Sequence, residues 1–137
     1  MQVEITPIFG SKKVILRQSK RSVTPFAGIS VFFEYLGQLG YAQKIAQHMP
    51  FKLTSPNAIP PAHTFTAFIV SVLVGARRFA HTGLFRIDKT LHALMGIIRL
   101  PNDDTIRNFF RRFTQASIYE FYDPLWRWML ERVAAAG

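Results

Sequence analysis

The chain has no cysteine, and this absence removes several kinds of chemistry at once. Without thiols there is no disulfide, no thiolate nucleophile, no cysteine-ligated zinc and no iron–sulfur cluster. The four histidines, at positions 48, 63, 81 and 92, form no His-x-x-x-His pair. A glycine-rich phosphate loop and a serine nucleophile elbow are also missing from the sequence. We therefore expect no catalytic, cofactor or metal site in this chain.

Long hydrophobic runs are equally scarce. The longest, Phe65 to Ala76, is interrupted by polar residues and ends before Arg77 and Arg78. It is shorter than the roughly 20 residues that cross a bilayer. No apolar stretch follows a basic start at the N-terminus, as it would in a secretory leader. The sequence predicts a cytoplasmic protein without a membrane partner.

Acidic residues are outnumbered two to one. The 137 residues contain 17 Lys and Arg against 8 Asp and Glu, which gives a net charge of +9. Such an excess favours polyanionic partners, either nucleic acid or an anionic membrane surface. Hydrophobic residues make up 49% and aromatic residues 14%, so global disorder is excluded. The length fits one domain.

Residues 1–22 predict a basic arm or β-hairpin. Val3 and Ile5 alternate with polar residues, and a second β-rich run, 14–16, follows a Gly/Ser turn. Basic arms of this kind follow the DNA backbone or enter the minor groove, although a solubilising terminus has the same composition. The candidate DNA-binding cations of the arm are Lys12, Lys13, Arg17, Lys20 and Arg21.

Residues 23–137 predict a mainly α fold, a small helical bundle that contains a helix-turn-helix-like segment. Hydrophobic periodicity, proline starts and glycine stops mark the elements. The most apolar helix should be the buried centre, and the last should begin at Asp123-Pro124. The expected helices cover about 28–40, 41–49, 60–79, 81–86, 89–95 behind an Asp88 cap, 103–113 behind Asn102 or Asp103, and the stretch from 123 onward.

Of the expected helices, the one at 103–113 separates its apolar side chains from its polar ones most clearly. At about 100° per residue, Ile106, Phe109, Phe110 and Phe113 share one stripe, and polar residues occupy the other side. Arginine grips phosphates or reads guanine, and asparagine reads adenine. The alternative is an ordinary solvated face, and two aspartates in the first turn would repel phosphate. The candidate DNA-binding residues here are Arg107, Asn108, Arg111 and Arg112.

Two further clusters have structural explanations. Arg77, Arg78 and Arg86 follow the apolar helix, where the helix dipole favours cations. Trp126 and Trp128 on the last helix form either core or a face for a partner.

Four segments resemble bacterial insertion-sequence transposases of the DDE type. They are 24–40 (TPFAGISVFFEYLGQLG), the pair 76–79 and 91–96, and above all 99–113 (RLPNDDTIRNFFRRF). The last is similar to the pattern R-L-P-S-x-x-T-x-x-R-F-L-R-R-F of that family. The resemblance implies a helical N-terminal part that binds the terminal inverted repeats of a mobile element, in a bacterial, nucleoid-associated protein. It also implies a ribonuclease-H-like catalytic domain, in which carboxylates hold divalent metal. No Asp or Glu of this chain matches those catalytic carboxylates.

The sequence thus predicts a chain that binds duplex DNA and is not catalytic alone, its missing catalytic domain being a partner. The alternative is an oligomerisation or assembly module, including a truncated transposase that regulates by mixed oligomerisation. The aromatic last helix favours the alternative, because an uncovered apolar face indicates a partner or a second copy of the chain.

Overall fold

The computed structural model describes residues 2–17 and 26–137. An N-terminal hairpin pairs β1 (Gln2–Ile5) with β2 (Val14–Arg17) in antiparallel register, Gln2 opposite Arg17 and Ile5 opposite Val14. The remaining described elements are helical. In chain order they are η1 (Ala27–Ile29), α1 (Ser30–Gln38), α2 (Tyr41–His48), α3 (Pro61–Leu73), η2 (Phe79–His81), α4 (Thr82–Phe85), α5 (Lys89–Met95), α6 (Asp103–Arg111) and α7 (Gln115–Ala136).

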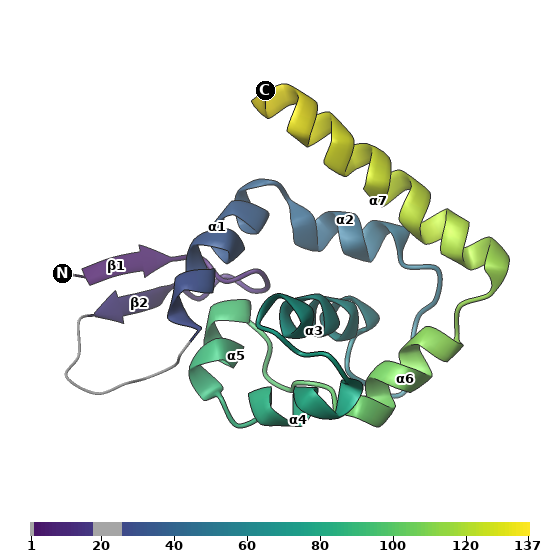
Figure 1. The fold of residues 1–137 in the computed structure, drawn as a ribbon, viewed down its shortest axis with the longest axis horizontal. Helices are drawn as coiled ribbons and strands as arrows, with labels where there is room; N and C mark the ends of the chain where they lie inside the picture. The colour runs from purple at the N-terminus through teal and green to yellow at the C-terminus, as the bar shows by residue number, and fades with distance from the viewer. Residues whose placement is uncertain (1, 18–25) are drawn as a thin grey trace.

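Helix α3 lies in the middle of the helical body (Figure 1). In this view α1 and α2 lie on one side of it, α4, α5 and α6 on the other, and α7 runs past α2 toward the C-terminus. The expected mainly α bundle behind an N-terminal hairpin is confirmed. The side chains most completely buried are Phe33, Ile45, Leu91, Leu94, Met95, Ile106 and Phe121.

The termini of α5 and α6 follow their local sequence signals. The Asp88 side chain accepts a hydrogen bond from the Leu91 backbone N–H, and Gly96 ends α5 in the left-handed conformation. The Asn102 side chain caps α6 by accepting from the Thr105 N–H at 2.8 Å. Both are standard capping arrangements, in which a short side chain or a glycine satisfies a free end of the helix.

The last helix begins earlier than expected. It starts at Gln115, and Pro124 lies inside it. Thr114 accepts from the Ser117 N–H while the Ser117 hydroxyl accepts from the Thr114 N–H, a reciprocal capping box. This cap starts the helix about two turns before Phe121, which is completely buried, so packing offsets the hydrogen bond that Pro124 cannot donate.

The apolar helix α3 ends earlier than expected, at Leu73 instead of about Phe79. Gly75 has a φ of 101°, and the Ala76 N–H donates back to the Ser71 carbonyl at 2.8 Å, which closes the helix. The helix is also not buried all round, because Val72 and Leu73 are about half exposed. Arg77 and Arg78 therefore lie beyond the helix, not in its last turn.

The hairpin is held on the helical body where its loop meets α5. The Phe9 N–H donates to the Met95 carbonyl at 3.1 Å, and Ile5 and Ile8 are buried in the shared core. Gly96 is required at this contact, since its φ is 73° and an added Cβ would lie 1.8 Å from the Phe9 carbonyl oxygen. The Phe9 ring also packs on His63, with centroids 4.3 Å apart.

We predict that Gly96→Ala lowers the free energy of unfolding by at least about 2 kcal/mol, because it adds both left-handed strain and a collision with backbone. Gly37→Ala is the matched control: Gly37 lies in α1 with nothing near its would-be Cβ, so alanine should stabilise by roughly 0.5–1 kcal/mol. Urea unfolding followed by circular dichroism measures both. Equal effects of the two substitutions would contradict the assigned contact.

We predict that the Phe9–His63 contact makes stability fall as the pH drops from 7 to 5. Burial lowers the pKa of His63, so the folded protein binds this proton less readily than the unfolded chain does. The stabilisation is present above the unfolded pKa of about 6.5 and is lost as the pH falls through the lower folded value. His63→Gln should flatten the dependence measured by urea unfolding. An unchanged slope in that variant would contradict the prediction.

Candidate nucleic-acid interface

Helix α6 is docked through the apolar stripe that the sequence predicts. Ile106 and Phe109 are buried, and Phe110 and Phe113 are half-buried. The Phe109 ring lies 5.5 Å from Phe51 of the 51–60 connector and 6.4 Å from Phe65 of α3. These contacts fix the rotation of α6 about its axis. Its polar residues consequently divide into two flanks with different charges.

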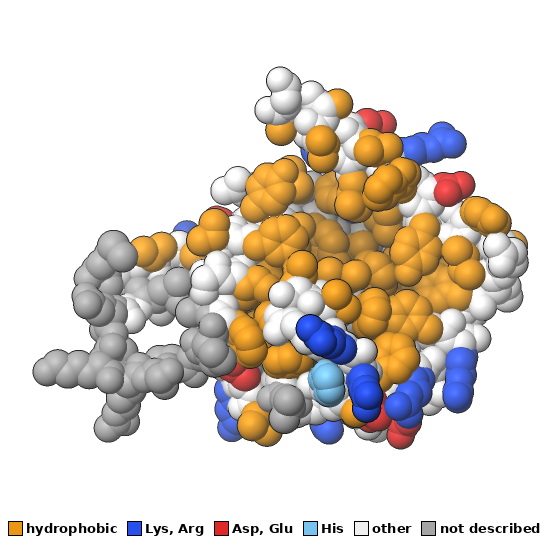
Figure 2. Space-filling model, in the orientation of Figure 1, with side chains coloured by type: hydrophobic (Ala, Val, Ile, Leu, Met, Phe, Trp, Pro, Cys, Tyr) orange, Lys and Arg blue, Asp and Glu red, His pale blue; other side chains and the backbone are white. Residues whose placement is uncertain are grey.

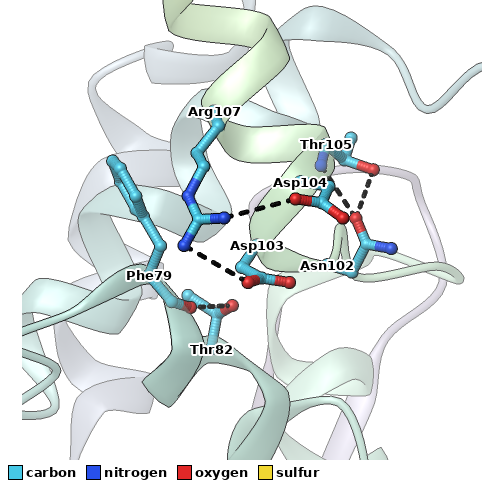
Figure 3. A network of polar contacts seen from close by, with 7 residues as sticks. All are labelled: Phe79, Thr82, Asn102, Asp103, Asp104, Thr105 and Arg107. Carbon is cyan, nitrogen blue, oxygen red and sulfur yellow. Dashed lines mark hydrogen bonds and ion pairs between the residues drawn. The ribbon is translucent and has the colours of Figure 1, made fainter.

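The first flank holds two acidic side chains and one basic one, so it is net negative. The Arg107 guanidinium lies 3.6 Å from Asp103 and 3.3 Å from Asp104, as Figure 3 shows, and it covers the Phe79 ring at 5.8 Å. Two carboxylates thus neutralise one guanidinium and engage both of its terminal nitrogens. Of the predicted DNA-binding residues, Arg107 is therefore the least available to a phosphate, because the aspartates both hold it and repel anions.

The second flank faces two adjoining cavities of about 240 and 260 Å³, which we call the basic groove. Asn108 of α6 and Arg112, the C-cap of α6, line the first cavity, and Arg86 lines the second. Arg99 lines both and donates to the Asn57 carbonyl at 3.0 Å. Among the described residues that line the basic groove, none is acidic.

Two arginines of the basic groove are braced by their surroundings. The hydrogen bond to Asn57 holds Arg99 against the connector, and the Arg112 guanidinium lies 6.0 Å from the centre of the Phe51 ring. A guanidinium near an aromatic ring gains a modest cation–π attraction. Each side chain keeps further N–H donors for an anion, because arginine has five.

The described cations of the arm, Lys12, Lys13 and Arg17, lie far from α6. Figure 1 places the hairpin and α6 toward opposite ends of the long axis. Lys12 and Arg17 are exposed on the hairpin, whereas Lys13 pairs with Glu4, and this hydrogen bond raises the pKa of Lys13. Lys20 and Arg21 lie outside the described residues. Among the described residues, the structure thus does not bring the cations of the arm together with those of α6.

Arg86 and Arg99 are members of the basic groove that the sequence did not single out as DNA-binding. Arg99 begins the 99–113 segment, so its position in that segment was an available signal. The sequence analysis grouped Arg86 with Arg77 and Arg78 and explained that cluster by the helix dipole, whereas the structure places Arg86 in the basic groove. Arg111 is exposed near the end of α6 and does not line the groove.

The helix-turn-helix role of α5 and α6 stays a prediction. The two helices are consecutive and joined by residues 96–102, as the sequence indicates. Helix α6 packs principally on α3 and η2, however, and Figure 1 shows α5 and α6 near opposite ends of α3. In a helix-turn-helix the first helix supports the second directly, and here that support comes from α3.

Within residues 2–17 and 26–137, no three His, Asp or Glu side chains gather as metal ligands would. The helices described there are also too short or too polar to cross a bilayer. No protein-family model matches the chain, and neither does any curated protein or solved structure.

We predict that Asn102→Ala lowers the free energy of unfolding by about 1 kcal/mol, because the Thr105 N–H loses its cap. Asn108→Ala is the matched control on the same helix. Asn108 is exposed within α6, where alanine is the better helix former, so that change should be neutral or slightly stabilising. Thermal unfolding compares them. A loss with Asn108→Ala as large as with Asn102→Ala would contradict the assignment.

Proposed function

We propose that this chain binds duplex DNA through the basic groove. The observation that supports it most is the separation of charge around α6: both aspartates of the helix lie with Arg107 on one flank, and Arg86, Arg99 and Arg112 converge on the other. Guanidinium groups that converge without acids among them suit the phosphates of a polyanion.

The dimensions of the basic groove favour backbone contact over base reading. Each cavity has room for a phosphate and part of a sugar, not for a duplex. The duplex would lie across the groove, with Arg99 and Arg112 on phosphates and the Asn108 amide beside them. The apolar stripe of α6 holds these groups in place, so little side-chain ordering is needed on binding.

We further propose that the chain is the N-terminal part of an insertion-sequence transposase and binds the terminal inverted repeats of its element. The segment that carries the resemblance, 99–113, supplies Arg99, Thr105 and Arg112 to the basic groove. Where the family pattern has Ser, this chain has Asn102, and both residue types cap helices. Where the pattern has Arg, this chain has Asn108. Catalysis would belong to the ribonuclease-H-like domain of a longer bacterial protein.

We predict that the double change Arg99→Gln/Arg112→Gln weakens DNA binding and lowers the slope of log K against log salt concentration by about two, one for each lost phosphate contact. The matched control is Arg107→Gln/Arg127→Gln, which removes the same charge from the first flank of α6 and from an exposed site on α7. It should change the slope much less. Fluorescence anisotropy over a salt series measures both, and equal losses would contradict the basic groove as the contact.

The transposase assignment has its own test in the choice of duplex. One probe carries a terminal inverted repeat of an insertion sequence whose transposase has the 99–113 pattern, and the other is its scrambled counterpart, both with heparin as competitor. Preference for the repeat supports end recognition. Equal binding to both supports DNA binding and contradicts end recognition, and no binding contradicts both.

A further inference from the structure

A groove of about 550 Å³, lined almost entirely by apolar side chains, lies apart from the basic groove. Helices α1 and α7 form its walls, and side chains of α2 and α3 form its floor. Figure 2 shows hydrophobic side chains gathered over and inside this hollow. Soluble proteins rarely leave so much contiguous apolar surface uncovered, and such patches mark interaction sites. We call this feature the apolar groove.

Helix α7 has two apolar stripes, and only one of them is buried in the core. Phe121, Leu125 and Trp128 are buried. Next to them runs a second stripe, exposed along its length, whose members are separated by 3, 4, 3 and 4 residues. That spacing is the heptad pattern by which one helix packs along another. The members of this exposed stripe are Tyr119, Tyr122, Trp126, Met129 and Val133.

The opposite wall offers matching surface. Phe32 and Tyr35 of α1 are 38% and 47% exposed and line the apolar groove, as do Trp126 (60% exposed) and Val133 (70% exposed) of α7. Since an aromatic side chain carries about 150–250 Å², the exposed apolar side chains of the two walls present on the order of 700 Å². A stable dimer buries about 800 Å² on each partner, so this face has nearly the area that a second copy requires.

Charge also favours a second copy at this face. Two molecules with a net charge of +9 repel each other over most of their surfaces. The charged residues that line the apolar groove are one acid and one base, Asp123 and Arg132, both on α7. The face is therefore neutral, and two copies can approach there without the repulsion that applies elsewhere.

We propose that two copies of this chain form a two-fold dimer in which the exposed stripe of each α7 packs into the apolar groove of the other. In an isologous interface the same surface patch of each copy contacts that of the other. One helix must therefore both line the groove of its own copy and pack into the groove of the partner. Helix α7 does so, because four members of its exposed stripe, from Tyr122 to Val133, line the groove. Trp126, Met129 and Val133 are the central contacts.

Sedimentation equilibrium without DNA tests the dimer. The wild type should dimerise, and raising the salt should not weaken the dimer, because screening reduces the repulsion between the +9 chains. Met129→Glu/Val133→Glu should raise the dimer Kd by about 100-fold or more, since it places charges at the centre of the interface. A wild type that is monomeric at all concentrations, or a dimer that persists in this variant, would overturn the proposal.

Ala116→Glu/Ala135→Glu is the matched control. Both alanines are exposed on α7, neither lines the apolar groove, and the charge change is identical. This variant should dimerise like the wild type. Loss of the dimer in it as well would show a general charge effect and overturn the assigned face. Both variants must still bind DNA with the wild-type salt slope per chain, which separates this proposal from the DNA-binding one.

A measurement on the unaltered chain gives an independent answer. Trp126 is 60% exposed and Trp128 is buried, so acrylamide quenching of tryptophan fluorescence reports mainly on Trp126. Quenching should decrease as the protein concentration passes through the dimer Kd. If the dimer forms and quenching stays constant, the interface lies elsewhere and the proposal fails.

Discussion

The positions of both surface features depend on the packing around Phe65. This buried ring of α3 lies 6.4 Å from Phe109 of α6 and 5.0 Å from Phe121 of α7. Phe113 joins the same group, 5.6 Å from Phe121, and Phe51 contacts it from the connector at 5.3 Å. Edge-to-face pairs of this kind prefer particular ring orientations, so they constrain the rotation of a helix as well as its distance. One aromatic group thereby sets which residues α6 and α7 turn outward.

Rotation matters because both helices carry two unlike surfaces. On α6, at 100° per residue, Asp103 and Arg107 lie on one side of the docked aromatic stripe, and Thr105, Asn108 and Arg112 lie on the other. Asp104 faces away from the stripe and pairs with Arg107. A count of charges over α6 gives two aspartates and two arginines, a neutral helix. The docked helix has instead an acidic flank and a basic flank, and only the second meets Arg99 and Arg86. The helix is a better candidate for phosphate contact than its two aspartates suggest.

Signals carried by a few adjacent residues were predictable from the sequence. The caps at Asp88, Gly96 and Asn102, the stripe of α6 and the hairpin all depend on local spacing, and the structure has each of them. Pro124 was misleading, because proline is typical of a first helical turn and the Thr114–Ser117 cap is a less conspicuous signal. Gly75 as the end of α3 was hidden by the apolar residues on both sides of it.

The basic groove was not predictable in this way, because its members come from three places in the chain. Arg86 follows α4, Arg99 lies in the turn before α6, and Arg112 ends α6. Their convergence depends on the connector, where the Asn57 carbonyl accepts from Arg99 and the Phe51 ring faces Arg112. These contacts join residues 42 and 61 positions apart, which no pattern within one segment can reveal.

The two proposed surfaces are compatible because they lie on different sides of the Phe65 group. Helix α6 contacts it from one side of α3 and α7 from the other, so a dimer formed through α7 leaves the basic groove of each copy uncovered (Figure 1). In the proposed dimer, two grooves related by a two-fold axis would hold two phosphate backbones in a fixed mutual orientation. A second contact on one DNA molecule is then intramolecular, with an effective concentration set by the rigid dimer and not by the solution. Weak contacts of single side chains with DNA phosphates would thus add up to firm binding without any base-specific contact. A groove too small for a duplex is then compatible with the proposed DNA-binding role.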